Sequence, residues 1–233
     1  MIEVADYSQS FGKKEVLRDV SFTIHKGEIV GLLGPSGSGK TTLIKSIIGM
    51  QRPTGGTISV MGETQPTLAV SKSIGYMAQA DALYGDLSAR GNLRYFGKLY
   101  GLKKKELAER VEEVLRFTDL TADASRPVHL FSGGMKRRLS LAIALIHEPP
   151  LLLLDEPTVG IDPKLKRVFW QEFEELRAKG VTIVVTTHIM DEAERCDRLL
   201  LIQDGRLLDG GTPQELKDEF GSIEGAFMRK EGV

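Results

Sequence analysis

The chain has 233 residues, enough to bury a full core as one large domain or as a core with an inserted lobe. Its 31 basic residues stand against 32 acidic ones, so bulk charge gives no reason to expect a nucleic acid as partner. One cysteine, Cys196, excludes a disulfide framework and fits a small apolar filler in a reducing compartment.

The hydropathy of the sequence does not favour a membrane-inserted protein. No apolar run approaches the roughly 18 residues of a membrane span, and the first residues lack the pattern of a secretion signal. We therefore expect a soluble protein whose membrane role, if any, comes through a partner.

The first part of the chain predicts strands and then helices. Alternating apolar residues predict half-buried antiparallel strands around 2–4 and 20–24, and further strands are expected over 28–33, 57–62 and 73–77. From Asn92 the apolar spacing changes to three and four, which predicts helices through about residues 100 and 115. A third helix is expected from Ser132 to about Glu148.

The second part returns to strands that are buried on both faces. The apolar runs 151–154 and 181–187 are typical of a parallel sheet. Between them, Asp162 and Pro163 predict a helix start. A hairpin is expected around Asp204-Gly205, and residues 212–215 form a capping box for a last helix.

With the glycine-rich turn 34–42 between the strand 28–33 and a following helix, this layout predicts an α/β fold with a P-loop core, a small N-terminal antiparallel sheet and an inserted helical part. We expect one domain over 1–233, with the core and the antiparallel sheet in 1–81 and 149–233 and the helical insert in 82–148.

A glycine-rich stretch between the strand 28–33 and a helix matches the pattern G-x-x-x-x-G-K-[ST]. Its glycines let backbone N–H groups point at a polyphosphate, and the helix N-terminus adds partial positive charge. Lys40 is expected on the β- and γ-phosphates and the Thr41 hydroxyl on Mg²⁺. A structural glycine turn is the alternative. The expected nucleotide-binding residues of this stretch are Gly34, Pro35, Ser36, Gly37, Ser38, Gly39, Lys40, Thr41 and Thr42.

Two acidic residues follow the apolar run 151–154. Asp155 should emerge at the carboxyl edge of the sheet, where it is suited to bind Mg²⁺ directly or through water. Glu156 is then placed to polarise an attacking water. The alternative is a surface acidic pair at a strand end.

Ser132, Gly133 and Gly134 form an unusual helix start. Serine is a good cap, but each glycine weakens a first helical turn by about 1 kcal/mol relative to alanine. A sequence tolerates this where the backbone approaches another group, and a bare helix N-terminus is a second anion site. Two phosphate-binding ends in one chain favour a symmetric dimer whose subunits complete each other's sites. A flexible loop–helix junction is the alternative.

Together these motifs resemble the nucleotide-binding subunit of an ABC transporter over nearly the whole chain. The Walker A motif 34–41, the Walker B run 151–155 with Glu156, and the signature Phe131-Ser132-Gly133-Gly134-Met135 occur in the family's order. Two departures are visible: the family's signature usually reads Leu-Ser-Gly-Gly-Gln, and its adenine-stacking aromatic is commonly tyrosine.

The resemblance implies further site residues. Gln79 matches the glutamine that senses metal and permease, His188 the histidine on the γ-phosphate, and Asp162 the dimer-crossing loop. Phe11 matches the aromatic that stacks on adenine. Each has a plainer alternative: a core histidine, a loop glutamine, a helix cap and a core phenylalanine.

The resemblance also implies the activity. Two copies would hold two ATP·Mg²⁺ head to tail, with Lys40, Glu156 and His188 as catalytic residues and Thr41, Gln79 and Asp155 around Mg²⁺. ATP hydrolysis would drive a separate membrane permease at the inner face of the cell membrane, with no nucleic acid as partner. Residues 85–93 and 131–139 resemble the branch paired with type-2 (ABC-2) exporter permeases for drugs, antibiotics, polysaccharides or lipids. Leu83 and Tyr84 are candidates for permease docking, with core packing as the alternative.

Two other functions remain open from the sequence. One is a non-transport ABC ATPase that acts on ribosomes or DNA, although such proteins usually carry a second domain or a long coiled coil. The other is a regulatory module that binds the nucleotide without hydrolysing it.

Overall fold

A computed structural model describes residues 1–229, and it divides the chain into two compact units. Unit 1 contains residues 1–71 and the chain from Thr182 onward, and unit 2 contains residues 72–181. The helical insert expected over residues 82–148 stays a prediction.

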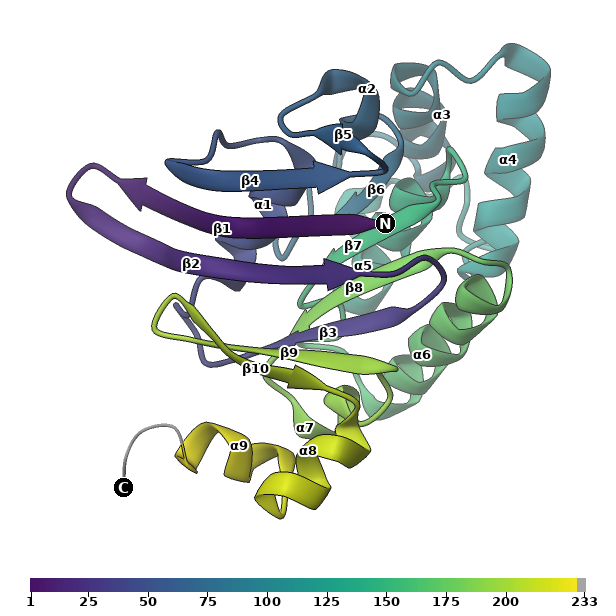
Figure 1. Cartoon of the computed structure of the whole chain (residues 1–233). Helices are drawn as coiled ribbons and strands as arrows, with labels where there is room; N and C mark the ends of the chain where they lie inside the picture. The colour runs from purple at the N-terminus through teal and green to yellow at the C-terminus, as the bar shows by residue number, and fades with distance from the viewer. Residues whose placement is uncertain (230–233) are drawn as a thin grey trace. The chain divides into compact units, whose positions relative to one another are not determined.

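Unit 1 contains a four-stranded antiparallel sheet near the N-terminus (Figure 1). Its strands are β1 (Ile2–Phe11), β2 (Lys14–Ile24), β4 (Gly55–Val60) and β5 (Glu63–Thr64), in the order β2-β1-β4-β5. Ile2, Val4, Val20 and Ile24 are buried on its inner face, as the alternation predicts. The small antiparallel sheet is therefore confirmed, although β4 begins two residues before the expected strand.

Unit 1 also holds the strand that leads into the glycine-rich loop. β3 (Ile29–Leu33) is fully buried and lies parallel to both β8 (Thr182–Thr187) and β9 (Arg198–Gln203), and β10 (Arg206–Gly211) pairs antiparallel with β9. Helix α1 (Lys40–Ile48) follows the loop. The other helices are α2 (Leu68–Ser71), α7 (Met190–Ala193), α8 (Pro213–Phe220) and α9 (Ile223–Arg229). Thr212 and Glu215 form the predicted capping box of α8.

Unit 2 combines two parallel strands with helices. Strand β6 (Ile74–Met77) pairs with β7 (Leu151–Asp155), whose five residues are all buried. The helices are α3 (Ala89–Leu99), α4 (Lys104–Phe117), α5 (Gly133–Leu145) and α6 (Pro163–Ala178), with a 3₁₀ turn at Val128–Leu130. Because β7 is buried along its whole length, Asp155 and the residues after it lie at the end of a rigid strand.

Two helices of unit 2 differ from their predicted bounds. Helix α3 begins earlier than Asn92 because the Ser88 side chain caps it and accepts a hydrogen bond from the Gly91 amide at 3.0 Å. Helix α5 ends at Leu145, three residues short of Glu148. The Arg110 guanidinium stabilises this end, donating to the carbonyl of Leu145 at 2.9 Å and to that of Ile146 at 3.3 Å.

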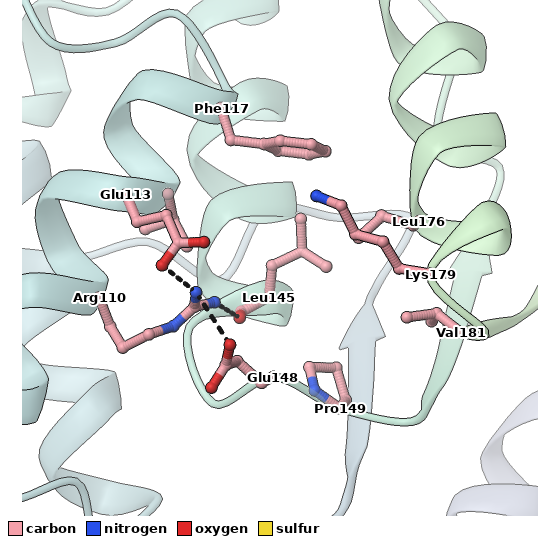
Figure 2. A pocket seen from close by; sticks show the side chains of 10 residues that line it. Arg110, Glu113, Phe117, Leu145, Glu148, Pro149, Leu176, Lys179 and Val181 are labelled. Carbon is pink, nitrogen blue, oxygen red and sulfur yellow. Dashed lines mark hydrogen bonds and ion pairs between the residues drawn. The ribbon is translucent and has the colours of Figure 1, made fainter.

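Arg110 also lines a cavity of about 190 Å³ in unit 2 (Figure 2). Figure 2 shows Phe117, Leu145 and Leu176 on its apolar walls and the ion pairs of Arg110 with Glu113 and Glu148 at one side. None of the predicted nucleotide-binding residues lines this cavity.

A buried carboxyl group in α6 makes the stability depend on pH. Burial raises the pKa of Glu172 to about 8, Arg138 opposes this, and the charges of Glu175 and Asp119 add to it. The carboxyl is therefore neutral in the folded protein at pH 7, whereas in the unfolded chain it ionises near its ordinary value.

We expect the Glu172→Gln variant to be more stable than the wild type at pH 8. Because the folded state of the wild type retains the proton, its stability falls as the pH rises from the unfolded pKa through the folded one. The substitution should remove this loss, worth about 4 kcal/mol at pH 8, and change little at pH 4.5. Urea unfolding at both pH values tests this, with Glu109→Gln on the exposed face of α4 as control. An equal effect at both values would contradict it.

Candidate functional site

The glycine-rich loop adopts the conformation that the sequence predicts for a phosphate-binding turn. Gly37 and Gly39 have φ values of 82° and 107°, a region that glycine adopts without strain. Gly39 directly precedes α1 and caps its N-terminus. A Cβ at Gly34 would lie 2.0 Å from the carbonyl oxygen of Ile202, so only glycine fits there.

Lys40 folds back over this loop. It is only 5% exposed, and its ammonium donates to the carbonyls of Gly34 at 2.7 Å and Pro35 at 3.0 Å. The Ser38 hydroxyl is buried in the same loop, and no residue of the described chain forms a hydrogen bond with it. A buried ammonium beside a buried unpaired hydroxyl at a helix N-terminus fits a bound polyphosphate. Ser36, Thr41 and Thr42 lie on the same loop and the first turn of α1.

The predicted catalytic carboxylate lies beside the predicted sensing glutamine in unit 2. Asp155 ends β7 and is 1% exposed, and Glu156 follows it with a left-handed φ of 49°. The Gln79 amide donates to Glu156 Oε2 at 2.8 Å. Burial and the charge of Asp155 raise the pKa of Tyr76 to about 12, so this phenol stays neutral. The structure thus brings together two residues that lie far apart in the sequence.

The signature residues begin a regular helix. Ser132 caps α5, and its hydroxyl accepts a hydrogen bond from the Met135 amide at 3.3 Å. A Cβ at Gly133 would meet no atom within 4 Å, whereas one at Gly134 would approach Leu165 at 3.0 Å. Ser132 and Gly133 are exposed, so the N–H groups of this helix end are accessible.

The remaining predicted residues lie at strand and helix ends. Asp162 is exposed and caps α6, accepting from the amides of Lys164 and Leu165 at 3.0 Å each. These hydrogen bonds lower the pKa of the Asp162 carboxyl, and the bond from Leu165 has the largest effect. His188 follows β8 and is exposed, and Phe11 ends β1 with 49% of its surface exposed. The alternatives of a core histidine and a core phenylalanine are therefore wrong.

Sequence reasoning missed one buried residue of this region, Arg137 in α5. Its guanidinium donates to the carbonyls of Gln79 at 2.9 Å and Glu156 at 2.6 Å. It also forms an ion pair with Asp81 at 3.4 Å, and Ser140 bonds the same carboxylate at 2.7 Å. Arg137 and Ser140 lie three positions apart and therefore share a face of α5, but no local pattern in the sequence indicates which distant segments that face contacts.

Few protein side chains are available as ligands for a metal ion. Within residues 1–229 no three His, Cys, Asp or Glu side chains gather where they could hold a metal ion. A nucleotide-bound Mg²⁺ needs only one or two protein carboxylates beside phosphate oxygens and water, so a buried strand-end carboxylate such as Asp155 fits one. The described helices also include none that is long and apolar enough to cross a lipid bilayer.

Comparison with known proteins identifies the family. Residues 17–159 match the family model described as ABC transporter. This chain belongs to the ABC transporter family.

Individual relatives agree with this assignment. The chain is 46% identical over 221 residues to Nod factor export ATP-binding protein I of Sinorhizobium fredii, covering 94% of this chain and 64% of that protein. A solved structure of an ATP-binding subunit of an ABC transporter matches with a TM-score of 0.89 at 33% identity, over 98% of both chains. A dimeric ATP-binding cassette bound to ADP and Pi matches with a TM-score of 0.84 at 27% identity, over 91% of this chain and 98% of that one.

These matches confirm the predicted fold and activity class. The fold is that of a P-loop NTPase with an antiparallel sheet and additional helices. The chain carries the ATP-binding, ATP-hydrolysing domain of the ABC transporter family. The relatives do not favour a non-transport ATPase acting on ribosomes or DNA.

Proposed function

We propose that two copies of this chain close head to tail around two ATP·Mg²⁺ and couple hydrolysis to a separate membrane permease. The observation that carries the proposal is the start of α5. Gly133 is exposed, and a side chain there would meet nothing within the chain, so packing inside one subunit does not explain the glycine. A partner nucleotide that approaches Ser132 and this exposed helix end does explain it. The solved cassette that binds ADP and Pi is a dimer.

The nucleotide would be held mainly by the loop of unit 1. Lys40 and the loop amides bind the phosphates, Thr41 and Thr42 lie at the start of the helix, and Phe11 offers an exposed ring to the adenine base. Ser132 and Gly134 of the other subunit would stabilise charge on the γ-phosphate from the opposite side. Asp162 would lie at the subunit boundary.

Hydrolysis would depend on Glu156. Its carboxylate accepts the proton of the attacking water as the bond between the γ-phosphorus and the leaving oxygen breaks. Gln79 holds this carboxylate through its amide, and His188 would orient the γ-phosphate and the water. Mg²⁺, bound through Thr41, Asp155 and Gln79, would neutralise charge on the β- and γ-phosphates.

A patch of exposed aromatic residues in unit 2 offers a surface for the permease. Tyr84 is 46% exposed and Tyr95 40% exposed; their ring centroids lie 4.7 Å apart, and their hydroxyls are hydrogen bonded at 3.1 Å. Leu87 beside them is 38% exposed, so core packing does not account for this segment. The proposed partner is a type-2 exporter permease at the inner face of the cell membrane, in line with the export named for the relative from S. fredii.

The Glu156→Gln variant tests the dimer. Because it should bind ATP without cleaving it, ATP·Mg²⁺ should convert it from a monomer to a dimer in light scattering behind size exclusion, whereas ADP should not. Adding Ser132→Arg places a bulky cation at the contact and should leave the doubly substituted protein monomeric with ATP. A monomer in every nucleotide state of Glu156→Gln would contradict the proposal.

A further inference from the structure

We propose that Arg137 is a positioning residue for ATP hydrolysis, which holds the backbone of Glu156 and Gln79 so that the carboxylate and the amide meet. The inference rests on the proposed role of Glu156. Its basis is the set of hydrogen bonds that one buried guanidinium makes to two segments of unit 2.

The first segment contains the catalytic carboxylate. Arg137 donates through Nη2 to the carbonyl of Glu156 at 2.6 Å and through Nε to that of Pro157 at 3.3 Å. Glu156 has a φ of 49°, a left-handed conformation that a residue with a side chain seldom adopts without support. The guanidinium binds the carbonyl of this strained residue, so it stabilises the backbone from which the carboxylate projects.

The second segment contains the glutamine that contacts this carboxylate. Nη1 donates to the carbonyls of Ala78 at 3.1 Å and Gln79 at 2.9 Å. The ion pair with Asp81 fixes the end of the same segment, and Ser140, one turn along α5, bonds Asp81 as well. Two residues on one face of α5 therefore hold residues 78–81 in place.

These contacts connect three parts of the proposed site. Ser132 caps the start of helix α5, and the guanidinium of the residue five positions later reaches the backbone of both members of the Gln79–Glu156 pair. Arg137 is 6% exposed, so the guanidinium meets protein groups rather than water. A shift of α5 would therefore move the backbone of both residues together.

Removing the guanidinium should slow the chemical step, while the affinity for the nucleotide should change little. We expect Arg137→Met to lower kcat by about 10–100-fold, as misplacement of a catalytic group by about 1 Å does, with KM for ATP within about threefold of the wild type. Arg137→Lys keeps the charge and a donor, so its kcat should lie between those of Arg137→Met and the wild type. Steady-state phosphate release over a range of ATP concentrations measures both constants.

Arg110→Met is the matched control. Arg110 is also a largely buried arginine that binds two backbone carbonyls, but these belong to Leu145 and Ile146 at the other end of α5 (Figure 2). Both variants should lower the melting temperature, whereas only Arg137→Met should lower kcat. If Arg137→Met loses stability and keeps its kcat, or if both variants lose kcat equally, the inference is overturned.

A double substitution separates this inference from the proposed function. If Arg137 acts through Glu156, adding Arg137→Met to Glu156→Gln should change the residual rate by less than about twofold, because residues that act as a unit are not additive. If Arg137→Met lowers the rate of Glu156→Gln by the same factor by which it lowers the rate of the wild type, the inference is contradicted. Full activity of Glu156→Gln alone would instead overturn the proposed function, and Arg137→Lys keeps the test valid if the methionine variant does not fold.

Discussion

Replacing Glu156 with glutamine is expected to lower the turnover of ATP by at least ~10²-fold, the effect typical of losing a general base. Glutamine has the same length and keeps an oxygen that can accept the hydrogen bond from Gln79, so the local structure should persist. It cannot accept the proton of the attacking water. Phosphate release measures turnover, and the affinity for a fluorescent ATP analogue should remain within a few fold of the wild type.

The exposed Glu109 of α4 supplies a control for this loss. Glu109→Gln makes the same chemical change outside the site and should leave turnover unchanged. Near-normal hydrolysis by Glu156→Gln would assign the base to another group. Loss of nucleotide binding together with turnover would indicate a structural role for Glu156 instead.

Replacing Lys40 with methionine is expected to weaken ATP binding by about 10–100-fold. A charge-assisted hydrogen bond to phosphate is worth about 1.5–3 kcal/mol, and methionine keeps the apolar stem without the ammonium. The side chain is nearly fully buried, and its ammonium donates to the carbonyls of Gly34 and Pro35 in the loop that it would hold around the phosphates. Titration with a fluorescent ATP analogue gives the dissociation constant directly.

Lys45 lies one and a half turns further along α1 and makes the matched comparison. Lys45→Met removes the same charge from the same helix and should bind ATP as the wild type does. Equal affinities of Lys40→Met and the wild type would show that the loop holds the nucleotide without its lysine, contrary to the proposed binding mode.

Much of the fold follows from local patterns in the sequence. The apolar run before Asp155, the capping box at Thr212 and the glycines before Lys40 each specify a local conformation, and the structure contains all three. The predicted positions of Gln79 and Glu156 at strand ends also place them where their side chains can meet. Helix ends were predicted less well, since α5 stops where Arg110 binds its last carbonyls.

The role of Arg137 could not be predicted in the same way. It reaches Gln79 across 58 positions of the chain and Glu156 across 19, and no local pattern encodes such distances. The left-handed φ of Glu156 could not be predicted either, because a glutamate after a buried strand does not indicate that conformation. The packing of α5 against both segments determines these features, and that packing depends on the tertiary structure.

The central claim is that each ATP site is shared between two subunits, and a mixing experiment tests it most directly. Lys40→Met and Ser132→Ala, which removes the hydroxyl without placing a bulky cation at the subunit contact, should each lose most of the ATPase activity when assayed alone. In a mixed dimer, the Lys40 of one subunit and the Ser132 of the other form one intact site, so an equimolar mixture should recover up to about a quarter of wild-type ATPase activity. If the mixture hydrolyses ATP no faster than the mean of the two separate variants, both halves of the site belong to one chain and the account is contradicted.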